Sequence, residues 1–259
     1  MFRNKGAKEG AIEEKSFTVE LNKKDKVDLW KKLNVKNDIG TIFAIHVSTK
    51  KFGKINKQKV FSKADVFLAK GNVPKNHLIN KGFYLDEYDL ESYSLKPIPF
   101  TGISVKRFDS LKYQIMKISP TTFKEVFNDT ELAAGASIYC KTIEDLKKNT
   151  LVLNGWKTDW IKFSKYIDDN FDLYVDRNSD INIFKNIKKL SNNKIHSLII
   201  KNEWISNFVF KGIGNFEEPY TATFLYEKGI LKLNYFLPFK VTTGSGRSKG
   251  VFTIVLKAG

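Results

Sequence analysis

Apolar residues in the first third of the chain follow two different patterns. Over residues 9–33, apolar clusters alternate with charged positions and predict a helix, and the polar run 22–25 divides it in two, with Asp25 as the cap of the second part. Short apolar runs with the composition of strands follow at residues 41–47, 64–68 and 102–106. The pattern therefore predicts a helical start followed by strands.

Helical spacing dominates the middle of the chain. Ser119 as N-cap and Pro120 at the first position predict a helix over 119–127. Further helices are predicted at residues 142–148, 158–170 and 180–190. Residues 131–140 are small and apolar and fit either a helix or a loop, and residues 192–210 fit either a strand or a helix.

From about Pro219 the apolar period changes to two. Strands are predicted at residues 220–226, 230–236 and 251–257, with Glu227-Lys228-Gly229 as a hairpin turn. This change of period predicts two parts: residues 1–145, and a helical and β-rich part over residues 146–259. One continuous domain with two lobes would give the same pattern, because 259 residues suit either organisation.

The amino-acid composition also indicates the kind of partner that the protein binds. Hydrophobic residues make up 42% of the chain, which is enough for a sizeable core and argues against global disorder. Lys and Arg number 44 against 28 Asp and Glu, a formal charge of +16. Such an excess favours a polyanionic partner, here a nucleic acid, and the alternative is a solvated basic surface in a lysine-rich chain.

Several protein classes are disfavoured by the same composition. The single cysteine, Cys140, excludes an internal disulfide and a cysteine-rich zinc site, and it indicates a reducing cytoplasm. The first residues are polar and show no secretory signal. No apolar run approaches the ~20 residues that a membrane helix requires, so no membrane partner is expected.

Two of the predicted strands carry polar residues suited to phosphodiester chemistry. Asp65 lies in the run 64–68, and Lys106 ends the run 102–106. If these strands are neighbours, Asp65 can bind a divalent metal, with the backbone carbonyl of Val105 as a further ligand. Lys106 can then position the attacking water and spread charge in the transition state. The alternative is that both side chains are solvated charges at strand ends.

Ala64-Asp65-Val66-Phe67-Leu68, followed by Ile103-Ser104-Val105-Lys106, resembles the core of PD-(D/E)xK nucleases, most of all type II restriction endonucleases. The resemblance covers roughly the first half of the chain. It implies a restriction-endonuclease-like α/β (α+β) fold, with a mixed central β-sheet flanked by helices, to which the C-terminal antiparallel β region is an addition. It also implies Mg²⁺ as cofactor and double-stranded DNA as substrate.

The same resemblance assigns further site residues and shows two departures. The helix before the sheet often brings a glutamate, so Glu13 or Glu14 is the candidate. Ser104 stands where the family usually has an acid, and the long separation between Asp65 and Lys106 implies an insertion between the two strands.

The glycine-rich basic segment 242–250 is the candidate DNA reader. Arg247 is suited to a guanine edge, and Lys249 and Ser245 to phosphates, with Lys240 as a further DNA contact. A flexible hairpin tip is the alternative interpretation. The acidic cluster at residues 86–91 is interpreted as an exposed loop, and His46, within an apolar run, as a core histidine.

Two functions are consistent with these patterns. The first is a Mg²⁺-dependent endonuclease that cuts double-stranded DNA at a specific sequence, and the second is a basic DNA- or RNA-binding protein without catalysis. A palindromic target would imply a homodimer with one active site per strand, whereas a monomer that nicks is the alternative.

Overall fold

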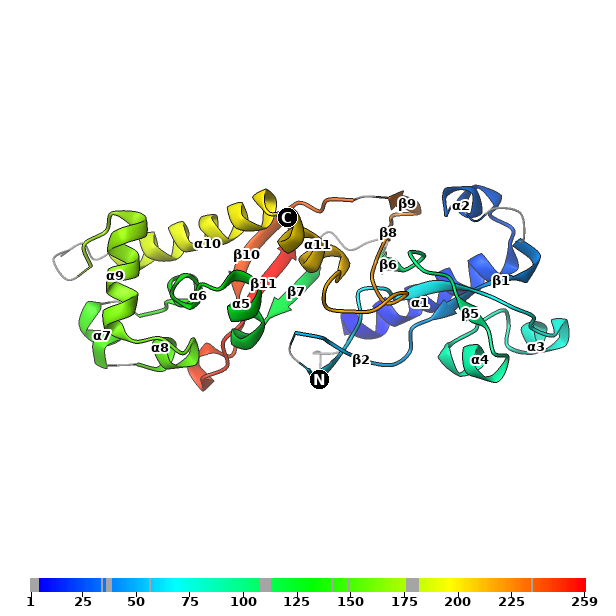
Figure 1. Ribbon diagram of the computed structural model, residues 1–259, viewed down its shortest axis with the longest axis horizontal. Helices are drawn as coiled ribbons and strands as arrows, with labels where there is room; N and C mark the ends of the chain where they lie inside the picture. Colours follow the sequence, from blue (N-terminus) through cyan, green and yellow to red (C-terminus); the bar gives the residue numbers. More distant parts are fainter. Residues whose placement is uncertain are drawn as a thin grey trace. The chain divides into compact units, whose positions relative to one another are not determined.

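The computed structural model describes residues 5–33, 35, 39–55, 57–107, 113–140, 142–148, 150–175, 182–233 and 235–259. The chain forms two compact units (Figure 1). Unit 1 comprises Met1–Ser110 and Phe210–Phe236, and unit 2 comprises Leu111–Val209 and Leu237–Gly259. The division predicted after residue 145 falls inside unit 2. The chain instead returns to the first sheet after residue 210, a long-range pairing that local patterns do not reveal.

Unit 1 is built from a sheet and short helices. Its helices are α1 (Lys5–Lys23), α2 (Val27–Lys32), α3 (Lys75–Asn80) and α4 (Glu87–Ser92), with the 3-10 turn η1 (Ile39–Thr41). Its strands are β1 (Ile42–His46), β2 (Lys51–Phe52), β3 (Lys59–Val60), β4 (Val66–Lys70), β5 (Lys96–Pro97), β6 (Ile103–Lys106), β8 (Phe224–Glu227) and β9 (Ile230–Leu233).

The main sheet of unit 1 is mixed, in the order β1-β4-β6-β8-β9, with β5 paired to β4. Strand β4 runs antiparallel to both β1 and β6, whereas β6 and β8 are parallel. The predicted hairpin at residues 227–229 joins β8 and β9, and Gly229 supplies the positive φ of 79° that this tight turn requires. β2 and β3 form a separate hairpin.

Both faces of this sheet are buried, as expected for strands whose residues are apolar on both sides. All five residues of β1 are buried. Ile42 and Ala44 belong to one core cluster, together with Phe17 of α1 and Trp30 of α2. Phe43 and Ile45 face the opposite cluster, whose other buried members are Val47 and residues between 67 and 95. The mixed central sheet flanked by helices is therefore confirmed.

Two local predictions for unit 1 are wrong. The predicted cap Asp25 is not used, because α2 begins after Lys26, which makes no side-chain cap, and the turn is set by Lys24 at a positive φ of 63°. The acidic segment predicted as a loop contains helix α4. Asp86 caps it by accepting a hydrogen bond from the Tyr88 N–H, and Asp89 accepts one from the Asp86 N–H in return.

Unit 2 is mainly helical. Its helices are α5 (Pro120–Phe127), α6 (Thr130–Ser137), α7 (Ile143–Lys148), α8 (Leu151–Gly155), α9 (Trp160–Phe171) and α10 (Ile183–Lys201), while α11 (Glu203–Lys211) continues into unit 1. Its strands β7 (Gln114–Ile118), β10 (Phe239–Thr243) and β11 (Ile254–Ala258) form an antiparallel sheet in the order β10-β11-β7, and the 3-10 turn η2 (Arg247–Lys249) lies between β10 and β11.

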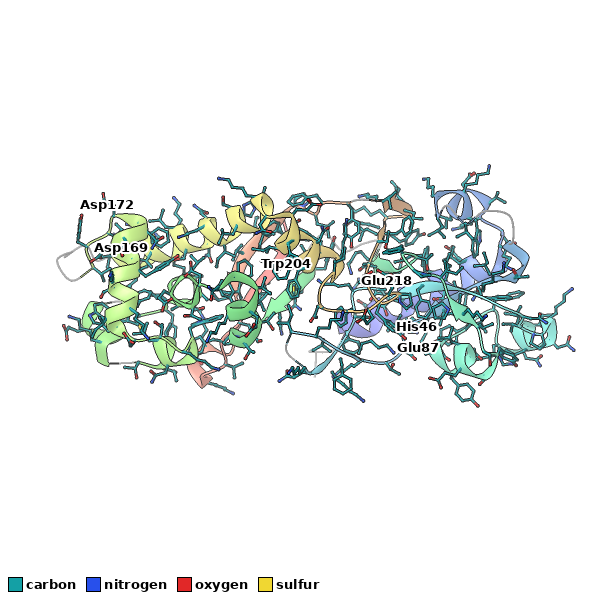
Figure 2. All side chains as sticks on the ribbon, viewed as in Figure 1. His46, Glu87, Asp169, Asp172, Trp204 and Glu218 are labelled. Carbon is teal, nitrogen blue, oxygen red and sulfur yellow. The ribbon has the colours of Figure 1, made fainter. Side chains whose placement is uncertain are left out.

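Several predictions for unit 2 are confirmed. Ser119 caps α5 by accepting a hydrogen bond from the Thr122 N–H. Helix α9 follows Asp159 as its N-cap and ends at Phe171. Its C-cap Asp172, labelled in Figure 2, adopts a positive φ of 53°. The start of the predicted helix 180–190 lies partly outside the described residues, but Ile183 onward is helical. Strand β10 was not predicted.

The small residues of α6 form the centre of unit 2. Residues 132–137 are all buried, and a methyl group on Gly135 would lie 2.3 Å from the Ser191 hydroxyl of α10. The indole N–H of the fully buried Trp156 donates to the Ser137 hydroxyl at 2.9 Å. The two interpretations left open for residues 131–140 are thus resolved in favour of a helix, because close approach to α10 requires small side chains.

Candidate active site

The candidate site lies where β4 and β6 diverge. The two strands pair through Val66 and Ile103, and Asp65 directly precedes β4. The Asp65 N–H still donates to the Ile103 carbonyl at 2.9 Å, but before Asp65 the chain turns away from β6. Residues 104–106 therefore extend beyond the region paired with β4 and lie alongside the Asp65 carboxylate.

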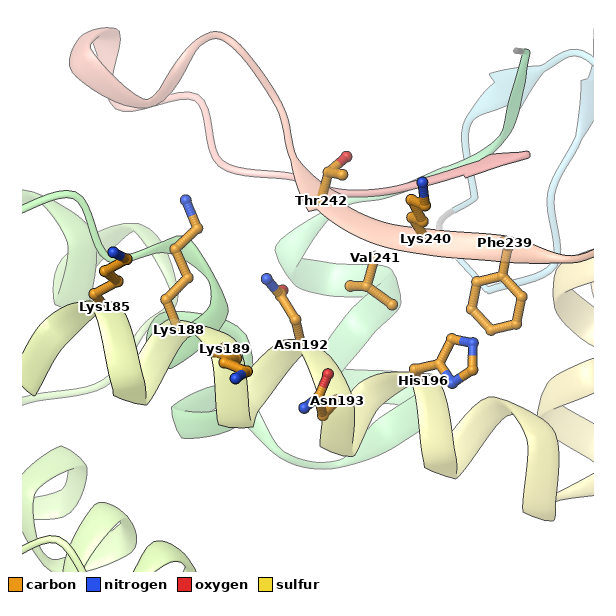
Figure 3. A pocket seen from close by; sticks show the side chains of 10 residues that line it. All are labelled: Lys185, Lys188, Lys189, Asn192, Asn193, His196, Phe239, Lys240, Val241 and Thr242. Carbon is orange, nitrogen blue, oxygen red and sulfur yellow. The ribbon is translucent and has the colours of Figure 1, made fainter. Parts of the chain in front are cut away.

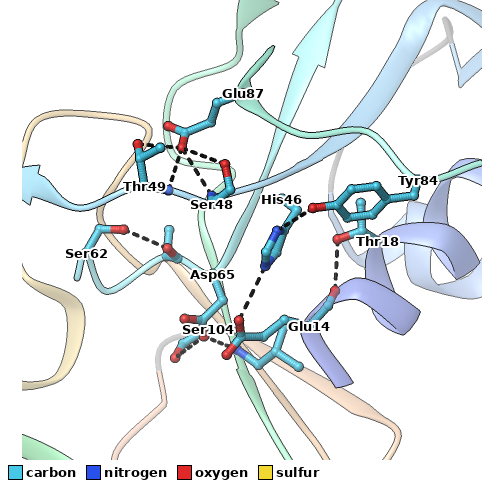
Figure 4. Close-up of polar contacts among 12 residues, drawn as sticks. Glu14, Thr18, His46, Ser48, Thr49, Ser62, Asp65, Tyr84, Glu87 and Ser104 are labelled. Carbon is cyan, nitrogen blue, oxygen red and sulfur yellow. Dashed lines mark hydrogen bonds and ion pairs between the residues drawn. The ribbon is translucent and has the colours of Figure 1, made fainter. Parts of the chain in front are cut away.

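Asp65 makes its contacts with the extending part of β6. Its Oδ2 atom accepts hydrogen bonds from the Ser104 hydroxyl at 3.2 Å (Figure 4) and from the Val105 N–H at 2.7 Å. The same atom lies 3.9 Å from Lys106 Nζ. The N–H and C=O groups of one strand residue face the same edge, so the Val105 carbonyl faces the side where Asp65 lies. The structure thus brings Asp65, Ser104, Val105 and Lys106 together.

Of the two candidate glutamates, Glu14 shares this site. The negative charge of Glu14 contributes to raising the pKa of Asp65, which places the two carboxylates near each other. Glu13 instead acts on Tyr226, whose pKa is raised by burial first and by Glu13 among several charges. Successive helix positions point about 100° apart, which explains why α1 delivers one of these two side chains to the site.

Burial and charge shift the acid–base behaviour of the site. The pKa of Asp65 is raised to about 6, first by burial and also by the charge of Glu14, against the opposing effects of Lys106 and of the hydrogen bonds from Val105 and Ser104. Burial also lowers the pKa of Lys63 to about 7, and the positive charge of Lys106 acts in the same direction. Perturbed pairs of this kind in a cleft are typical of functional sites, although structural ion pairs produce them too.

His46 and Tyr84 extend the site and were missed by the sequence analysis. His46 is only 5% exposed, and its Nε2 atom lies 3.4 Å from Glu14 Oε2 while its Nδ1 atom lies 2.9 Å from the Tyr84 hydroxyl. Burial and neighbouring carboxylates raise the pKa of Tyr84 to about 12, so the phenol keeps its proton. When the Tyr84 hydroxyl donates a hydrogen bond to Nδ1 of His46, the imidazole proton is on Nε2 and faces Glu14.

Glu87, near His46 in unit 1 (Figure 2), has a different role. Its Oε2 atom accepts hydrogen bonds from the Thr49 N–H and hydroxyl at 2.9 and 2.8 Å, and its Oε1 atom pairs with Lys51. Burial opposes ionisation, but the donors from Lys51 and Thr49 outweigh it and the pKa of Glu87 is lowered. Glu87 therefore anchors the segment after β1.

The donor set of the site is suited to Mg²⁺. Among the residues that the structure describes, no group of three or more His, Cys, Asp or Glu side chains is arranged to hold a metal. Mg²⁺ usually binds one or two carboxylates and keeps several waters, so a larger group is not required. Asp65, Glu14 and the Val105 carbonyl would hold the ion, because a cation between the two carboxylates relieves their mutual repulsion.

The predicted DNA contacts all belong to unit 2. The Arg247 guanidinium donates to the Ser137 carbonyl at 3.2 Å and lies 5.4 Å from the centre of the Tyr139 ring. It is thus engaged within unit 2 and does not extend from a flexible tip. Ser245 and Lys249 are exposed in the connection between β10 and β11, and Lys240 is exposed on β10.

Neither protein-family models nor curated proteins gave a match to this chain. Within the described ranges, no helix combines the length and the apolar character needed to cross a bilayer.

Proposed function

We propose that the protein is a Mg²⁺-dependent endonuclease that hydrolyses phosphodiester bonds of double-stranded DNA at a specific sequence, similar to type II restriction enzymes. The observation that carries the proposal is the convergence of Asp65 and Lys106, from separate strands, with 3.9 Å between carboxylate oxygen and ammonium nitrogen. The formal charge of +16 supports a polyanionic substrate.

Each site residue has a role that its contacts support. Ser104 and the Val105 N–H fix the orientation of the Asp65 carboxylate. His46 orients Glu14, and Tyr84 in turn orients His46. Lys106, 23% exposed, holds a water or a phosphate oxygen and stabilises charge that develops on the phosphate. Mg²⁺, when bound by Asp65 and Glu14, supplies Lewis acidity toward the scissile phosphate and a more acidic water.

The test is cleavage of supercoiled plasmid in Mg²⁺. Asp65→Ala and Lys106→Ala are each expected to lower the cleavage rate about 10³-fold, because each removes a group that acts in the transition state. Matched controls are Asp28→Ala and Lys75→Ala, which remove the same charges from exposed positions in unit 1. Sequencing of the product ends reports whether cutting is site-specific.

The outcomes separate the proposal from its alternative. Cleavage that survives either site substitution refutes the assigned site. Gel-shift experiments in EDTA should show that both variants still bind DNA. A wild-type protein that shifts duplex DNA in a salt-sensitive manner but leaves it intact at every Mg²⁺ concentration is a binding protein without catalysis.

A further inference from the structure

Unit 2 contains an open groove of about 580 Å³ between helix α10 and strand β10 (Figure 3). The volume lies within the range of about 300–1,000 Å³ that is typical of small-molecule and cofactor sites. Phe239 and Val241 point from β10 toward α10, whereas Lys240 and Thr242 point to the other side of the strand. This alternation, which is inherent to a strand, gives the groove an apolar wall opposite a polar helix face.

The helix face changes in character along its length. Lys185, Lys188 and Lys189 line the groove at the start of α10, and no acidic side chain is among its described lining residues. The pKa of Lys188 is lowered by burial and by the nearby charge of Arg247. The lysines and Arg247 thus gather positive charge that a bound anion would relieve.

The other end of the groove carries amide and aromatic groups. Asn192 follows the lysines by one helical turn, about 5 Å. Its Oδ1 atom is buried and has no hydrogen-bond partner within the described part of the chain. Beyond it, the His196 ring stacks on Phe239 with 4.4 Å between ring centres. An unsatisfied buried acceptor beside an aromatic wall fits a heterocycle that brings an amino donor.

We propose that this groove binds one strand of nucleic acid, with a phosphate held by Lys185 and Lys189 and a base placed beside the stacked pair of His196 and Phe239, its amino group donating to Asn192. A duplex does not enter this groove, because β10 faces the helix across a space of only about 580 Å³. The proposal rests on the proposed function only in taking the strand to be DNA.

The experiment measures binding of a fluorescent 12-nucleotide single strand in EDTA over a range of salt concentrations. Lys185→Gln with Lys189→Gln should raise the dissociation constant about tenfold and reduce the slope of log affinity against log salt by about 0.7, because one phosphate contact is lost. The matched control, Lys165→Gln with Lys201→Gln, removes the same charge from exposed helix positions outside the groove and should change affinity less than about twofold. Equal losses in both double variants would overturn the proposal.

Competition experiments show which form of nucleic acid the groove prefers: a single strand, a duplex or a free nucleotide. An unlabelled single strand should displace the probe at lower concentration than a duplex of the same sequence or deoxyadenosine monophosphate, and the reverse order with either competitor overturns the proposal. Asn192→Ala should reduce the preference for adenine-rich over thymine-rich strands without lowering the melting temperature, because it removes an acceptor that is already unpaired. An unchanged base preference overturns the assigned role of Asn192.

Binding and cutting fail independently in this design. EDTA removes the metal on which cleavage depends, so a groove that does not bind leaves the cleavage rates of the Asp65 and Lys106 variants fully interpretable. If the protein binds the strand through the groove but never cuts DNA, the proposed groove stands and the proposed nuclease function fails.

Discussion

The site carboxylate is expected to lower the stability of the fold. Asp65 is 22% exposed, and burial raises its pKa to about 6 from the value of about 3.9 that an unfolded chain gives. The folded state therefore binds more protons than the unfolded state between about pH 4 and 6, and stability falls as pH rises through this window. Two pKa units at about 1.4 kcal/mol each correspond to about 3 kcal/mol above pH 6.

Asp65→Asn removes this ionisation while keeping the shape of the side chain and an acceptor for the Val105 N–H. The variant should be more stable than the wild type at pH 8 by up to about 3 kcal/mol, and the difference should disappear near pH 4. Urea unfolding of both proteins at several pH values measures it, and the titration of groups far from Asp65 cancels in the difference.

Mg²⁺ should reduce this difference in stability by about half. A concentration ten times the dissociation constant stabilises the wild type by about 1.4 kcal/mol and the variant much less, because the variant lacks the charged ligand. A variant less stable than the wild type at pH 8 without metal, or a difference that is independent of pH, would refute the assignment of an electrostatically strained carboxylate to this position.

Five further substitutions test other parts of unit 1. Glu14→Gln should lower plasmid cleavage by about 10²-fold, while Glu13→Gln, one position away on the helix, should leave it within about twofold. Asp89→Ala should destabilise the fold by about 3 kcal/mol at pH 7, since Asp89 is fully buried and its carboxylate lies 2.6 Å from Lys81 Nζ and 2.9 Å from His77 Nε2. Hydrogen bonds lower its pKa against the effect of burial, so this stabilisation is present above about pH 4 and is lost at lower pH; urea unfolding at pH 7 and 3 checks both statements. Gly102→Ala should cost about 3 kcal/mol in thermal unfolding, because the added methyl would lie 1.8 Å from a backbone oxygen, whereas Gly229→Ala, with open space but φ of 79°, should cost about 1 kcal/mol.

Local signals in the sequence predicted the elements with their own caps and periods. Ser119 with Pro120 marked the start of α5, and the turn at residues 227–229 marked the β8–β9 hairpin, since each depends on side chains within a few positions. Helix α4 was not predicted, because its six residues are too few to show a helical period. It is stabilised by the Asp86 cap and by the pairing of Asp89 with His77 and Lys81.

The residues of the candidate site likewise divide into those that local signals in the sequence predicted and those that they did not. Asp65 and Lys106 were identified because each follows or precedes a run of strand-forming residues, and Glu14 was one of two adjacent alternatives. His46 was interpreted as a core histidine because its neighbours in sequence are apolar. Its contacts with Glu14 and Tyr84 come from α1 and from the segment before α4, so nothing near position 46 could indicate them.

By itself, then, the sequence determined the types of most elements, the basic charge and the two strands that carry Asp65 and Lys106. Only the tertiary structure decided that residues 224–233 join the first sheet, that Glu14 and not Glu13 reaches Asp65, and that α10 and β10 enclose a groove. The physical reason is that caps, turns and periods act over a few residues, whereas strand pairing, helix rotation and grooves depend on burying side chains from distant segments together.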